Sequence, residues 1–101
     1  MPYFAVTMEN GPNFDESRGR REQDLWHEHA AFMDRLVDDG FVIIGGPIGD
    51  GGRTMHAIEA ESEDAIRTRL AEDPWAPLGI LKVGRIEPWQ LWLDGRSRPS
   101  A

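Results

Sequence analysis

The feature that most constrains the fold is an abrupt change of hydrophobic period in the first half of the chain. Residues 20–39 carry apolar side chains at helical spacing, and Gly40 follows where a left-handed residue often ends a helix. The next segment, "FVIIGGP" at 41–47, is a continuous apolar run closed by glycine and proline. This change predicts a helix packed against a sheet, and we expect the strand to be central and buried on both faces.

Signals for the remaining elements extend this pair in both directions. Strands are predicted for "YFAVTM" at 3–8, "TMHAIEA" at 54–60 and "LGILKVGRI" at 78–86. A second helix is predicted for 62–73, with Ser62 as its N-cap. The order β-α-β-β-α-β predicts an α+β, ferredoxin-like fold, in which two helices cover one face of an antiparallel sheet. We expect one domain over residues 1–95 and a disordered tail over 96–101.

Two proline-containing segments interrupt this order. We expect "PWAP" at 74–77 to break the chain, because the residue before a proline avoids the helical region. After Glu87-Pro88, "WQLWL" at 89–93 is predicted to continue the last strand as a short extension. Its large apolar side chains would form an unusually large patch on a monomer. Homodimerisation through the sheets would cover them.

Charge and composition exclude several classes of function. The formal net charge of −7 disfavours nucleic acid and anionic membranes as partners, since both require a cationic surface. The chain has no cysteine, which excludes thiolate metal sites and cysteine nucleophiles. No apolar run approaches the roughly 20 residues of a membrane span, and the first residues do not resemble a signal peptide. We therefore expect a cytoplasmic protein.

One residue conflicts with the apolar stripe of the first helix. His29 falls near the middle of a stripe that is otherwise apolar and comprises Leu25, Trp26, Phe32, Met33, Leu36 and Val37. In a β-α-β-β-α-β fold, the loop 9–21, the glycine-rich turn 45–52 and the segment around Asp73 share one rim, and we expect His29 about two helical turns below it. Asp73 is the one carboxylate near the second helix that could reach this ring. Such a pair could act as a general base and its orienting group.

Simpler interpretations of the same residues stay open at this stage. An inward histidine is often a core residue bonded to a backbone carbonyl, and an aspartate before a proline is often a turn residue. No metal site is expected, because His27 and His29 lie on different sides of the helix and the face of His56 is undetermined. The arginines at 18, 20 and 21 could be solvated, or could anchor a substrate carboxylate.

Several of these positions together resemble a known family. A helical histidine followed eleven residues later by glycine, then Gly-Pro, a serine before the second helix, and Asp-Pro is similar to the YCII-related domain family. The matching positions are His29, Gly40, Gly46, Pro47, Ser62, Asp73 and Pro74. The resemblance implies a dimeric α/β barrel with a catalytic pair at His29 and Asp73, and elimination or isomerisation of small lactones. The loop 9–21 and the doubled glycine at 45–46 depart from the family pattern and leave the substrate open.

The leading hypothesis is a small homodimeric enzyme without cofactor or metal. His29 would abstract a proton from a small lactone or carboxylate-bearing metabolite, and Asp73 would orient its imidazole. The substrate would be bound by Trp26, Phe32, Gly46, Pro47, Arg20 and Arg21. The alternatives are a ligand-binding or regulatory dimer with the same pocket, and an accessory domain without a cavity near His29.

Overall fold

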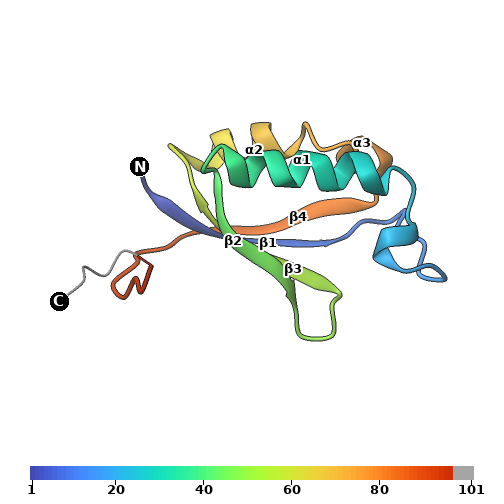
Figure 1. Cartoon of the computed structure of the whole chain (residues 1–101), viewed down its shortest axis with the longest axis horizontal. Helices are drawn as coiled ribbons and strands as arrows, with labels where there is room; N and C mark the ends of the chain where they lie inside the picture. The colour runs from blue at the N-terminus through green and yellow to red at the C-terminus, as the bar shows by residue number, and fades with distance from the viewer. Residues whose placement is uncertain (97–101) are drawn as a thin grey trace.

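The computed structural model describes residues 1–96, which form one antiparallel sheet with all the helices on one face (Figure 1). This confirms the predicted α+β, ferredoxin-like fold. The predicted tail lies outside the described residues apart from Arg96, so the domain limit stays a prediction. In chain order the elements are β1 (Tyr3–Asn10), the 3-10 turn η1 (Arg20–Glu22), α1 (Trp26–Asp38), β2 (Val42–Ile48), β3 (Arg53–Glu59), α2 (Glu63–Leu70), α3 (Trp75–Leu78) and β4 (Leu81–Pro88).

The strand order of the sheet is β2-β3-β1-β4, and every neighbouring pair is antiparallel. The prediction that the apolar run at 41–47 forms a central strand is therefore wrong, because β2 lies at an edge. Ile44 pairs with Ala57 and is 62% exposed, on the sheet face away from the helices. The continuous apolar character of β2 thus reflects a second face that residues 1–96 leave uncovered.

The first helix is shorter than predicted. It begins at Trp26 instead of residue 20, after Leu25 adopts a left-handed conformation with φ of 58°. The preceding segment is held in a loop by the buried side chain of Gln23, whose amide group bonds to the backbone of Asp15, Arg18 and Gly19. The predicted end is confirmed, since Gly40 follows the helix with φ of 77°. Within residues 1–96, no helix has the length and apolar content needed to cross a bilayer.

The two proline-containing segments also differ from their predictions. "PWAP" does not break the chain but forms α3, because Pro74 stands at the N-cap and proline is tolerated in a first helical turn. The predicted extension at 89–93 is not a strand. The Trp89 N–H donates to the carbonyl of Tyr3, and pairing stops there because Tyr3 is the first residue of β1.

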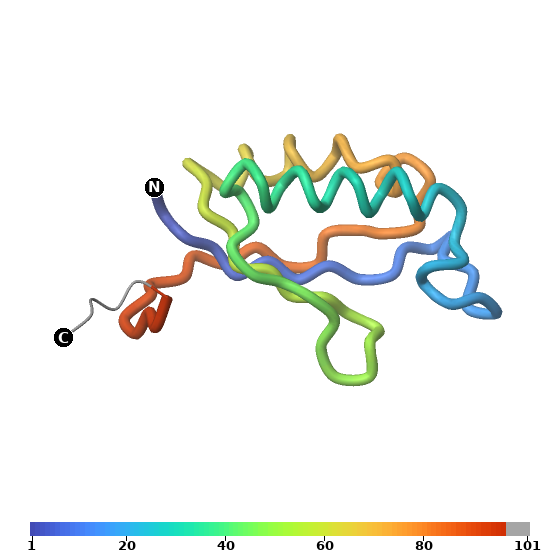
Figure 2. The backbone as a smooth tube through the Cα atoms, viewed as in Figure 1, coloured from blue at the N-terminus to red at the C-terminus, as the bar shows by residue number. Residues whose placement is uncertain are grey.

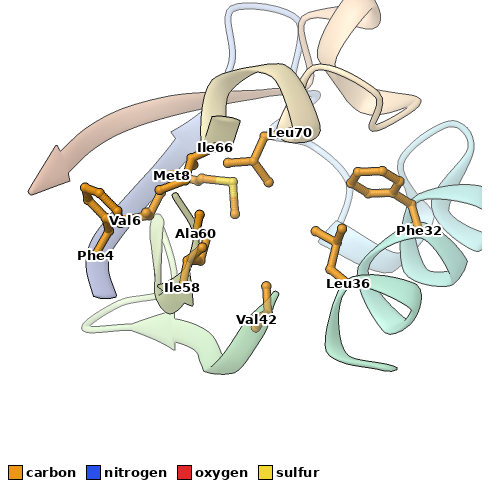
Figure 3. Close-up of a cluster of buried hydrophobic side chains, with 10 residues drawn as sticks. All are labelled: Phe4, Val6, Met8, Phe32, Leu36, Val42, Ile58, Ala60, Ile66 and Leu70. Atoms are coloured by element: carbon orange, nitrogen blue, oxygen red, sulfur yellow. The ribbon is translucent and has the colours of Figure 1, made fainter. Parts of the chain in front are cut away.

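The core lies between the sheet and the helices (Figure 3). Alternate residues of β1 point toward α1 and α2, as the two-residue period of a strand requires. The buried cluster comprises Phe4, Val6, Met8, Phe32, Leu36, Val42, Ile58, Ala60, Ile66 and Leu70.

Among the described residues, no helix covers the opposite face of the sheet (Figure 1). Two adjoining grooves cross this face and share Ile44, Ala57 and Trp89. Ile44, Trp89 and Leu93 are all exposed.

The N-cap of α2 provides a test of the local structure. The Ser62 hydroxyl accepts a hydrogen bond from the Ala65 N–H at 3.1 Å. We predict that Ser62→Ala lowers the free energy of unfolding by about 1 kcal/mol, whereas Ser62→Asp retains nearly all of it. Urea unfolding of both variants measures this, and equal losses would contradict the capping role.

Candidate functional site

His29 and Asp73 form a buried pair between α1 and the segment that follows α2. The Nδ1 atom of His29 lies 2.8 Å from one carboxylate oxygen of Asp73 and 3.0 Å from the other. The two residues are 7% and 4% exposed, so water competes little for this contact. A carboxylate only accepts hydrogen bonds, so Nδ1 carries the proton and donates it. The second ring nitrogen, Nε2, has no partner among the described residues.

Trp75 holds both members of this pair. Its indole stacks on the His29 ring, with centroids 3.8 Å apart and planes 2° from parallel, and its backbone N–H donates to Asp73. The indole Nε1 donates to the carbonyl of Asp24 at 2.6 Å, and Trp75 is only 1% exposed. Trp26 contacts both rings at a tilted angle. The imidazole is therefore fixed in position and orientation.

The His29 ring borders a cavity of about 310 Å³ between the helices and the sheet. This volume lies at the lower end of small-molecule pockets, which span roughly 300–1,000 Å³. Its lining is mainly apolar with a few polar groups, as is usual for such pockets. The lining residues are Met8, Arg20, Arg21, Trp26, His29, Met33, Gly46, Pro47, Thr54, His56 and Leu81.

The loop between β1 and α1 forms one edge of this cavity. It lies at the end of the sheet opposite the N-terminus (Figure 2). Arg20, in η1, donates through Nη2 to the carbonyl of Gly51 at 2.8 Å, which ties the loop to the turn between β2 and β3. Arg21 also lines the cavity and is exposed. Two arginine side chains therefore line this edge of the cavity.

The structure brings together most of the residues that the sequence predicted for a site. Asp73 does not line the cavity but accepts a hydrogen bond from His29. The predicted residues that do line it are Arg20, Arg21, Trp26, His29, Gly46 and Pro47. Two placements were wrong. Phe32 packs in the hydrophobic core and does not line the cavity. His29 lies in the first turn of α1 and not two turns inside it, because the helix begins later than predicted.

The sequence did not predict the apolar lining residues Met8, Met33 and Leu81, nor three residues that bear on the chemistry of the site. Thr54 and His56 line the cavity from β3, and Trp75 clamps the pair. The strand period could have placed Thr54 and His56, because they alternate with Met55 and share a face with the core residue Ile58. Trp75 was not predicted as a site residue, because "PWAP" was expected to break the chain.

His56 occupies an unusual environment. Its ring lies over Gly45 of β2, where a Cβ atom would come within 2.2 Å of the imidazole, so only glycine fits. Burial, followed by the charges of His29 and Arg20, lowers the pKa of His56 from its ordinary 6.5 to about 4. The ring is therefore neutral near pH 7. In residues 1–96, no three His, Asp or Glu side chains are grouped to hold a metal ion.

Comparison with known proteins supports the fold. The sequence matches no protein-family model and no curated protein sequence. Its structure is similar to that of 5-chloro-2-hydroxyhydroquinone dehydrochlorinase from Burkholderia phenoliruptrix AC1100 in complex with 2,5-dihydroxybenzoquinone. The TM-score is 0.64 at 24% sequence identity, and the match covers 87% of this chain and 93% of the other. At this identity the likeness establishes a shared fold.

The buried neutral His56 predicts a specific pH dependence of stability. The unfolded chain binds a proton near pH 6.5 and the folded chain only near pH 4, so acid favours unfolding between these values. We predict that His56 contributes a loss of stability on the order of 3 kcal/mol from pH 7 to pH 4. Urea unfolding at several pH values should show that the free energy of unfolding falls less steeply with decreasing pH in His56→Gln than in the wild type. Identical pH profiles for the two proteins would contradict this assignment.

Proposed function

We propose that this chain is a small enzyme that needs no cofactor and uses His29 and Asp73 to move a proton on a small oxygenated ring compound. The observation that carries the proposal is the buried hydrogen bond between Asp73 and Nδ1 of His29, beside a cavity. This arrangement leaves Nε2 as the basic nitrogen of the ring. A histidine oriented by a carboxylate is a common form of general base.

In the proposed reaction, Nε2 of His29 removes a proton from a carbon next to a carbonyl or lactone group. The electrons of the C–H bond form a new C=C bond. In an elimination they expel a leaving group such as halide or carboxylate; in an isomerisation, His29 returns the proton to a different carbon. Asp73 stabilises the imidazolium formed after proton abstraction, and Arg20 and Arg21 are available to bind negative charge on the substrate.

Two likenesses support the substrate class. The resemblance to the YCII-related domain family implies elimination or isomerisation of small lactones, and membership in that family is part of the proposal. The structural neighbour is a dehydrochlorinase of a chlorinated hydroxyhydroquinone. Loss of hydrogen chloride and rearrangement of a lactone both require that a small oxygenated ring gives up a proton, which is the step proposed for His29. The mainly apolar cavity and its arginines suit such a compound.

We further propose a homodimer in which two sheets pack face to face, as in a dimeric α/β barrel. The support is the exposed apolar face formed by Ile44, Trp89 and Leu93, which no described part of the chain covers. Burial of this face in a second copy would remove it from water. The cytoplasmic location stays a prediction.

Substitution of the two dyad residues tests the proposed chemistry. We predict that His29→Gln and Asp73→Asn each lower kcat/KM by roughly 10²- to 10⁴-fold, because general base catalysis has this magnitude. Turnover is measured on a panel of small ring-derived lactones and chlorinated hydroxyhydroquinones. His27→Gln is the matched control, because His27 is exposed on the same helix.

Full activity of both dyad variants on a substrate that the wild type turns over would exclude the dyad mechanism. Tight binding of a panel compound without any product would instead favour a ligand-binding protein. The control must retain wild-type activity.

The dimer proposal predicts a selective effect of charge on the uncovered face. Ile44→Glu should weaken self-association at least about 100-fold, since it removes apolar burial and adds a charge to the interface. Leu78→Glu, an exposed apolar position in the helical layer, should not. Sedimentation equilibrium measures both, and a monomeric wild type would contradict the proposal.

A further inference from the structure

The sheet side of the cavity contains two buried polar atoms without partners. Thr54 and His56 are 6% and 7% exposed, and neither Oγ1 of Thr54 nor Nδ1 of His56 forms a hydrogen bond within the described chain. Buried polar atoms are nearly always bonded, and an unsatisfied one costs about 1–3 kcal/mol. Both residues line the cavity beside His29, but these two atoms have almost no accessible surface, so a group bound in the cavity can supply the missing bonds once the Thr54 hydroxyl or the His56 ring turns toward it.

The strand that carries these two residues fixes the face on which they lie. They stand two residues apart on β3 and pair with Met8 and Val6 of β1, so both point toward the helices. The His56 ring also rests on the backbone of Gly45 in the neighbouring strand. The backbone of this wall is therefore held in place before a ligand arrives, so binding requires only side-chain rotations, which limits its entropic cost.

The charge state of this wall determines which groups it can recognise. Neutral His56 offers one N–H donor and one lone pair, and the Thr54 hydroxyl can donate and accept. Among the groups near His56, His29 on α1 and Arg20 in η1 can carry positive charge and Asp34 on α1 can carry negative charge, whereas Val6 on β1 and Thr54 on β3 cannot titrate. Arg20 can therefore bind a negatively charged group of a ligand, whereas Thr54 and His56 can bind an uncharged hydroxyl or carbonyl group.

We propose that Thr54 and His56 form a second polar subsite, which holds a hydroxyl or carbonyl oxygen of the substrate while His29 acts on its other edge. This inference rests on the proposed function and narrows its substrate class to planar rings with oxygen substituents at two well-separated positions. His29 lines the cavity on the side of the helices, and the subsite lines it on the side of the sheet. A ring with a single oxygen substituent would leave one of these walls unsatisfied.

Two probes of matched shape test the subsite without turnover. Benzene-1,4-diol has two hydroxyls, and 4-methylphenol replaces one of them by a methyl group. We expect the wild type to bind the diol about 10-fold more tightly, since one to two net hydrogen bonds are worth about 1.4 kcal/mol. Calorimetric or NMR titration under anaerobic conditions measures both affinities. Equal affinities, or no binding of either probe at millimolar concentration, would overturn the proposal. A bound water would then be the partner of Oγ1 of Thr54 and Nδ1 of His56.

Substitutions assign the preference to the two residues. Thr54→Val keeps the shape of the side chain but removes the hydroxyl, and should reduce the preference for the diol; Thr54→Ser should restore it. His56→Leu should reduce it, and His56→Gln should retain part of it. A preference unchanged in both Thr54→Val and His56→Leu would overturn the proposal. If His56→Leu does not fold, the ¹⁵N resonances of His56 in the wild type must shift with the diol and not with 4-methylphenol.

The His29→Gln variant separates this proposal from the proposed catalysis. It should lose turnover and keep the preference for the diol, because the glutamine amide can still bond an oxygen on the helix side and the subsite lies on a different element. A protein that turns over substrate through His29 but does not distinguish the probes has the catalytic pair without the subsite. A protein that distinguishes them but has no His29-dependent activity has the subsite without the chemistry.

Discussion

The stacking of Trp75 on His29 is the contact on which the site depends. A neutral imidazole on a helix can rotate, and its proton can occupy either nitrogen. Trp75 removes the first freedom by covering one face of the ring, and Asp73 removes the second by accepting from Nδ1. Both restraints come from one short segment, because the backbone N–H of Trp75 also bonds the Asp73 carboxylate. The proline at 74 begins the helical turn that makes this geometry possible.

The two polar walls of the cavity come from different layers of the fold. His29 belongs to the helices, and Thr54 and His56 belong to the sheet. Their relative position is therefore set by the packing of α1 against the strands, through core residues such as Leu36 and Ile58. A substitution that shifts this packing would change the distance between the walls without touching any polar group. The dimensions of the site therefore depend on the packing of the hydrophobic core.

Local patterns predicted much of this structure. The helical period, the N-cap at Ser62 and the glycine at 40 identified the helices, and their order with the strands gave the ferredoxin-like fold. The pairing of His29 with Asp73 was predicted from the inward position of His29 on its helix together with the chain directions of the fold. Features that depend on tertiary contacts could not be read: the edge position of β2 depends on which strands pair, and the start of α1 depends on Gln23 bonding to a loop. The role of Trp75 required knowing that "PWAP" folds as a helical turn.

The central claim is that Asp73 holds His29 with Nε2 free to accept a proton from a ligand in the cavity. The tautomer of His29, measured from its ¹⁵N ring shifts at a pH where the ring is neutral, tests this claim most directly. The account predicts that the wild type carries its proton on Nδ1 and that Asp73→Asn weakens this preference. A proton on Nε2 in the wild type, or a preference for Nδ1 unaffected by Asp73→Asn, would contradict it.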